Sequence, residues 1–193
     1  MRRIYAIALG LAVLLATPGL AHADNYATPA QRQQAIDMVI KRAVSQQGVP
    51  FTYGGGDING PSLPPVREEP SATGLTANNP DPLFPSLLTP AAPAAPVAPK
   101  VAGFDASGLI VYAFGGVGIK MPRSSGEQYK VGRKILPSQA LPGDLIFYGP
   151  EGTQSVTMFI GNGQMVGVTD KAVTVSPVRT NEMAPYLSRI IEW

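Results

Sequence analysis

The feature that most constrains this chain is a glycine-flanked aspartate placed directly before an apolar run. The stretch extends from Gly103 to Phe114, with Asp105 near its start. An aspartate in this place is typical of a helix N-cap, because its carboxylate accepts hydrogen bonds from the first free amides of the helix. A helix that is apolar nearly all round belongs in a core. We therefore predict a buried helix from Asp105 to about Gly116.

The residue after this cap stands at the N-terminus of the predicted helix. An anion is favoured there, and a cysteine would have a lowered thiol pKa. The residue here is Ala106, which has no heteroatom, and the chain contains no cysteine at all. Its single histidine, His22, lies in a segment that we expect to be removed. The mature protein is therefore predicted to lack both residue types.

Residues 1–23 have the pattern of a secretory signal peptide. Arg2 and Arg3 precede an apolar stretch, and Ala21 to Ala23 has the form of an Ala-x-Ala cleavage site. We expect a protein that is secreted or held in the cell wall or periplasm, with no stable membrane insertion. Removing the leader takes away two of the 15 basic residues and none of the 13 acidic ones, so the net charge falls to zero. That balance argues against nucleic acid as a partner.

Residues 24–193 are enough for one domain, interrupted by a Pro/Ala-rich insert at about residues 60–100. The insert holds eleven of the chain's 20 prolines and has no sustained apolar period, which is typical of an extended or disordered segment. Its ends should lie close together, because Gly56 and Gly103 belong to one scaffold. Two roles stay open: a tolerated surface loop, or a lid in which Leu83, Phe84, Leu87 and Leu88 cover a groove.

Periodicity predicts the other elements of an α+β domain. Thr28-Pro29 marks the start of a helix that ends near Gly48 to Pro50. Its apolar stripe comprises Ala35, Ile36, Val39, Ile40 and Ala43. The predicted strands are Asp144 to Tyr148, Val156 to Ile160, Gln164 to Val168, Val173 to Val178 and Leu187 to Glu192. We expect the helices to pack on a curved antiparallel sheet of about five strands, with Gly161-Asn162-Gly163 as a hairpin turn.

Several motifs resemble those of the NlpC/p60 family of papain-like cell-wall peptidases, and within it those of the mycobacterial Rip proteins. They are Gly48 to Gly55, Asp105 to Gly108, Met121 to Ser125, Leu141 to Phe147 and Ser155 to Gly163. The resemblance implies the papain-like fold. It also implies the function of cutting peptidoglycan stem peptides with a cysteine, a histidine and a third polar residue.

The three positions that correspond to this triad are Ala106, Ser155 and Gly167. A serine hydroxyl is not a general base near neutral pH, and glycine has no side chain to orient one. We therefore expect a catalytically inactive domain that binds stem peptides without cleaving them. We expect no cofactor, no metal site and a monomeric protein.

The resemblance suggests that five residues bind the ligand, namely Tyr53, Asp105, Ser107, Arg123 and Ser124. Arg123 could grip a stem carboxylate with two hydrogen bonds, although the basic run from Lys120 to Lys134 could equally be a solvated face. The glycines from Gly54 to Gly56 allow a close backbone approach, either to a ligand or to the central helix.

Two other functions stay open from the sequence. One is a hydrolase with relocated chemistry, using Ser107 or Ser155 as nucleophile or Asp105 with Asp144 as a carboxylate pair. The other is a regulatory partner of active cell-wall peptidases, for which the Pro-rich insert could be the docking element.

Overall fold

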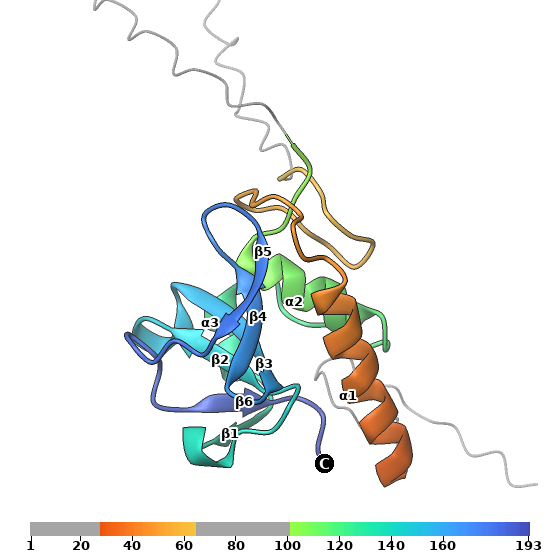
Figure 1. The fold of residues 1–193 in the computed structure, drawn as a ribbon, viewed down its shortest axis with the longest axis vertical. Coiled ribbons are helices and arrows are strands. Elements are labelled where there is room, and N and C mark those ends of the chain that lie inside the picture. The colour runs from red at the N-terminus through yellow and green to blue at the C-terminus, as the bar shows by residue number, and fades with distance from the viewer. Residues whose placement is uncertain (1–27, 65–100) are drawn as a thin grey trace, which may run out of the picture.

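The computed structural model describes residues 28–64 and 101–193 (Figure 1). The predicted signal peptide and the proposed lid residues Leu83 to Leu88 lie outside these ranges, so both stay predictions. In the described part, three α-helices accompany one six-stranded sheet. The helix α2 lies between α1 and the sheet, as Figure 1 shows.

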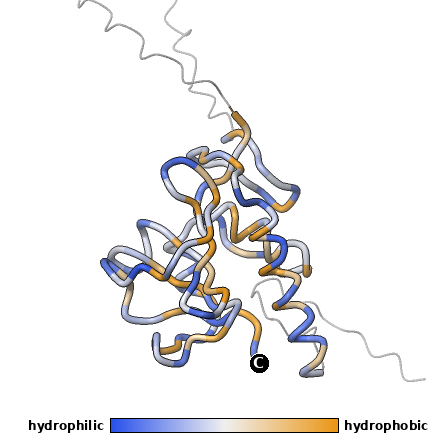
Figure 2. Tube along the Cα trace, viewed as in Figure 1, coloured by the Kyte–Doolittle hydropathy of each residue, from blue (hydrophilic) through white to orange (hydrophobic). Residues whose placement is uncertain are grey.

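The helix α1 (Pro29–Val44) begins where the sequence predicted. Thr28 forms a capping box with Gln31, and Pro29 occupies the first helical turn. The buried residues of its stripe are Ala35, Ile36, Val39 and Ala43, while Ile40 is only partly buried. Figure 2 shows hydrophilic and hydrophobic residues alternating along this helix, as expected of one that covers a core.

The predicted C-terminus of α1 was wrong by about four residues. The helix ends at Val44, and the chain then turns at Gly48, whose φ is +89°. The Gly48 amide donates to the carbonyl of Val173, 2.9 Å away. Backbone pairing with Val173 therefore already begins at Gly48, where the sequence predicted the end of the helix.

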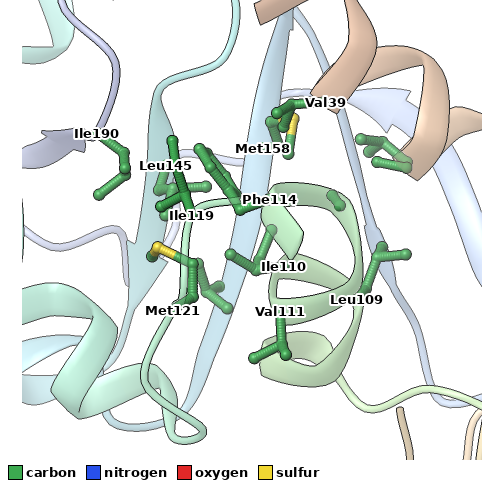
Figure 3. Close-up of a cluster of buried hydrophobic side chains, with 14 of the residues drawn as sticks. Val39, Leu109, Ile110, Val111, Phe114, Ile119, Met121, Leu145, Met158 and Ile190 are labelled. Carbon is green, nitrogen blue, oxygen red and sulfur yellow. The ribbon is translucent and has the colours of Figure 1, made fainter. Parts of the chain in front are cut away.

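The central helix α2 (Ala106–Gly115) confirms the prediction of a buried helix capped by Asp105. Seven of its ten residues are buried. Figure 3 shows side chains from α1, α2 and the sheet gathered in one core, among them Val39, Leu109, Ile110, Phe114, Leu145 and Met158. Burial of these apolar side chains is the main stabilising contribution that holds α2 between the two other layers.

The sheet is antiparallel throughout, with the order β1-β6-β2-β3-β4-β5. Its strands are β1 (Arg133–Ile135), β2 (Leu145–Tyr148), β3 (Ser155–Gly161), β4 (Gln164–Val168), β5 (Val173–Pro177) and β6 (Leu187–Arg189). The sequence missed β1, whose Arg-Lys-Ile run reads as part of a basic surface. The strand exists because all three residues pair with β6.

The hairpin between β3 and β4 confirms the predicted turn. Asn162 and Gly163 have φ values of 52° and 68°, the left-handed conformation that a two-residue hairpin of this hand requires. Both strands carry buried residues toward α2.

The predicted closeness of the two ends of the insert is also confirmed. Ser62 and Gly103 exchange two backbone hydrogen bonds, of 3.0 and 3.1 Å. No helix in the described residues is long and apolar enough to cross a membrane.

Candidate functional site

An open cavity of about 970 Å³ lies beside the N-terminus of α2. Its lining comes from the loop after α1, the start of α2, the segment around α3 (Ser125–Lys130), the ends of strands β2 to β4, and the loop before β6. All five predicted ligand-binding residues line it: Tyr53, Asp105, Ser107, Arg123 and Ser124. The fold therefore brings these residues together, and their role in binding stays a prediction.

The carboxylate of Asp105 is the centre of a hydrogen-bond network at the cavity wall. Its Oδ1 accepts from the Gly108 amide at 2.6 Å, the Ser107 hydroxyl at 3.0 Å and Arg123 Nη1 at 2.9 Å. Its Oδ2 accepts from the Gly54 amide at 3.1 Å and Arg123 Nη2 at 2.9 Å. With five donors, the carboxylate holds the helix cap and the adjoining loop in place, and it has little capacity left for a ligand.

Arg123 makes a two-pronged contact inside the protein. Besides Asp105, its Nη1 donates to the Ser107 hydroxyl at 2.8 Å and its Nη2 donates to the Gly55 carbonyl at 2.9 Å. Four of its five N–H groups are thus engaged. A ligand carboxylate at Arg123 would have to compete with Asp105. The sequence predicted that Arg123 could bind a ligand carboxylate, but it did not reveal this internal ion pair.

The other two predicted residues differ in their freedom to bind. The Ser124 hydroxyl caps α3 by accepting from the Glu127 amide at 3.3 Å, and it donates to the Glu127 carboxylate at 2.9 Å. Tyr53 is 84% exposed, and its hydroxyl has no hydrogen bond to any described residue. Of the five, Tyr53 is the residue most open to a ligand.

The close approach of the glycine segment is to the central helix. A Cβ at Gly56 would lie 3.1 Å from the backbone of Gly108, and a Cβ at Gly108 would collide with the Gly55 carbonyl oxygen. These glycines are needed for the loop to contact α2, which resolves the alternative left open by the sequence.

The three positions that correspond to the catalytic triad have different surroundings. Ala106 begins α2 and Ser155 begins β3, and both line the cavity. Gly167 is buried in β4 and is not part of the lining. A Cβ at Gly167 would come nearer than 3.0 Å to the methyl group of Thr157. The space for a third side chain is thus occupied by a neighbour.

The predicted carboxylate pair of Asp105 and Asp144 does not form. Asp144 is 1% exposed and binds Arg189 through two hydrogen bonds of 2.8 and 2.7 Å. It is not among the residues that line the cavity. This ion pair joins the start of β2 to β6 and is structural, so that form of relocated chemistry is wrong.

Sequence reasoning missed three charged residues that line the cavity. Asp170 follows β4, and Arg179 and Glu182 lie in the loop between β5 and β6. No motif or periodic pattern marks these residues. They reach the cavity only because the order of the strands in the sheet brings their loops there. Among the described residues there is no group of three His, Cys, Asp or Glu that could hold a metal ion.

Comparison with known proteins identifies the family. The NlpC/P60 profile matches residues 88–192. This chain belongs to the NlpC/P60 family. Across 95% of its length it is 41% identical to the peptidoglycan endopeptidase RipB of Mycobacterium tuberculosis, of which it covers 67%. The α+β fold, with helices and an antiparallel sheet, is that of its NlpC/P60 structural neighbours.

Two other NlpC/P60 proteins are informative. RipD of M. tuberculosis is 50% identical, with a TM-score of 0.61 over 82% of this chain and 98% of the RipD chain; its structure describes a non-catalytic domain adapted to peptidoglycan binding. The peptidoglycan endopeptidase RipA of M. tuberculosis is 44% identical over 83% of this chain, which spans 28% of RipA. RipA structures carry mutations at a cysteine, a histidine and a glutamate.

Proposed function

We propose that this protein is a non-catalytic NlpC/P60 domain that binds peptidoglycan stem peptides in the cavity without cleaving them. The observation that carries the proposal is Ala106, a methyl group at the N-terminus of α2 facing the cavity, in a chain without cysteine. A carbonyl carbon is attacked by a heteroatom, and this position offers none.

The spacing of the three positions supports the same assignment. In the mutated RipA structures the cysteine precedes the histidine by 49 residues, and the histidine precedes the glutamate by 12. The same intervals of 49 and 12 residues separate Ala106, Ser155 and Gly167. The three replacements would remove, in this order, the nucleophile, the general base and the residue that orients the base.

A hydrolase with relocated chemistry has little support from the cavity. A serine nucleophile needs a base such as histidine or lysine, and neither type is among the described residues that line it. The Ser107 hydroxyl is held between Asp105 and Arg123 and is 8% exposed. The acceptor of its proton, the Asp105 carboxylate, is already engaged by Arg123 through both oxygens.

Binding without cleavage asks less of the site. A volume of about 970 Å³ lies within the range of pockets that hold small ligands, and Tyr53, Arg179 and Glu182 offer polar groups of both charges. Peptidoglycan lies outside the cytoplasm, which agrees with the predicted export signal.

A pull-down with insoluble cell wall, followed by mass spectrometry of the soluble fraction, tests both halves of the proposal. We expect the protein to sediment with the wall and to release no new free amines, while RipB under the same conditions releases them. Protein that stays wholly in the supernatant would overturn the binding function, and released peptide fragments would overturn the loss of catalysis.

A further inference from the structure

The two arginines that line the cavity differ in what their guanidinium groups contact. Arg123 is held by Asp105, Ser107 and Gly55. The guanidinium of Arg179 has no ion pair and no hydrogen bond to any residue in the described ranges. Of the two guanidinium groups, only that of Arg123 has an ion pair or hydrogen bond within the described part of the chain.

Arg179 is nevertheless held in place by its surroundings. Its guanidinium carbon lies 4.1 Å from the ring centre of Tyr148, and the Tyr148 hydroxyl donates to the Arg179 backbone carbonyl at 3.0 Å. Tyr148 is 1% exposed, so this platform is rigid. The ring contact uses none of the guanidinium N–H groups, which have no hydrogen bond among the described residues and are the groups that bind carboxylates.

The loop that carries Arg179 is fastened to the sheet on both sides. The Val178 amide donates to the Gly163 carbonyl at 2.8 Å, and the Gly149 amide donates to the Glu182 carbonyl at 2.9 Å. A side chain on a fastened loop loses less conformational entropy when it binds a ligand.

We infer that Arg179 binds a carboxylate of the peptide ligand, and this inference rests on the proposed function. A free guanidinium edge and a planar carboxylate form two parallel charge-assisted hydrogen bonds. Asp170 and Glu182 line the same cavity and also have no ion pair among the described residues. They disfavour a second carboxylate nearby and suit a ligand that also carries an amino group.

Calorimetry with a soluble stem peptide tests the inference, using one peptide with free carboxylates and one in which they are amidated. For the wild-type protein we expect amidation to weaken binding roughly tenfold to a hundredfold, the range for hydrogen bonds to charged groups. R179Q should bind the free peptide as weakly as the wild type binds the amidated one. R179K should fall between, because it keeps the charge and loses the planar fork.

K171Q is the matched control, because Lys171 is exposed, close in sequence to Asp170 and outside the cavity lining. It should bind like the wild type, and circular dichroism should show all variants folded. To tell which carboxylate is bound, peptides amidated only at the C-terminus or only at a side chain are compared. The arm that loses affinity identifies the source.

Unchanged binding by R179Q, with its preference for the free peptide retained, would overturn the inference and leave the proposed function standing. An equal loss in K171Q would also overturn it, because the effect would then be one of overall charge. Wild-type protein that binds neither cell wall nor either peptide would overturn the proposed function, and the inference with it.

Discussion

At the scale of single residues, the contact between Gly167 and Thr157 shows more than the sequence did. From sequence, Gly167 is a lost side chain. In the structure its place is filled by the methyl group of Thr157, whose hydroxyl contacts the Met165 sulfur at 3.3 Å. A larger side chain at position 167 would therefore collide with Thr157 unless Thr157 moved.

G167A should therefore lower the free energy of unfolding by about 1–3 kcal/mol, the usual cost of overpacking a core. T157S removes the methyl group and keeps the hydroxyl, so the same substitution should cost less in that background. Urea unfolding of the wild type, both single variants and the double variant measures the coupling. Equal costs in the two backgrounds would contradict the contact.

Ala106 offers a second test at this scale. A106C places a thiol at the N-terminus of α2, where partial positive charge favours the thiolate, so its pKa should fall below about 8.5. S45C is the control, because Ser45 is exposed and caps the C-terminus of a different helix, α1, where the helix dipole does not favour a thiolate. Alkylation rates measured against pH should titrate earlier for A106C. Equal titration of the two thiols would argue against an effect of the helix terminus.

At the scale of elements, local signals predicted what local chemistry decides. The capping pair Thr28 and Pro29, the cap Asp105 and the turn Asn162-Gly163 each confirm a boundary taken from sequence. The strand β1 was not predicted from the sequence, because it pairs with β6, which lies more than 50 residues further along the chain. In the candidate site, the residues of the motifs were predicted to lie together, and they line one cavity. Arg179 reaches this cavity through the order of the strands, and no sequence motif marks it.

The strand β1 also holds the residue with the largest described change in acidity. Burial lowers the pKa of Lys134 to about 8. Its ammonium lies 3.4 Å from the ring centre of Tyr129 and 2.9 Å from the Ser188 hydroxyl. Lys134 is exposed as a whole, and it is its ammonium group that lies against α3 and β6.

This shift makes stability depend on pH in a definite direction. In the unfolded chain a lysine keeps its proton to about pH 10.4, so between about pH 8 and that value the unfolded state binds more protons. Stability should rise with pH in this range, and K134M should remove that rise relative to the wild type. Urea unfolding at several pH values measures it, with the exposed Lys120 changed in K120M as control. The same slope in wild type and K134M would contradict the assignment.

At the scale of the whole molecule, the described residues on both sides of the segment 65–100 belong to one core. The helix α1, the central helix and the sheet share one core. Backbone hydrogen bonds join Phe104 to Pro50 and Thr52, and join Ser62 to Gly103. Composition predicted an insert here, and pairing of its two ends is what lets a single domain contain it.

Replacing residues 65–100 with a short Gly/Ser linker should therefore leave a folded protein that still binds cell wall. Thermal unfolding and the pull-down measure the two outcomes, with full-length protein as the reference. Lost folding would show that the segment belongs to the core. Altered peptide affinity in a folded variant would favour the lid over the surface loop.

The hydrogen-bonded pair of Ser62 and Gly103 has a consequence for variation in this part of the chain. A loop whose two ends are tied at one point can grow without stretching the frame, and each doubling of its length costs only about 0.6 kcal/mol in closure entropy. Insertions here therefore cost little stability, and a foreign sequence grafted at this point should leave the scaffold beneath it unchanged.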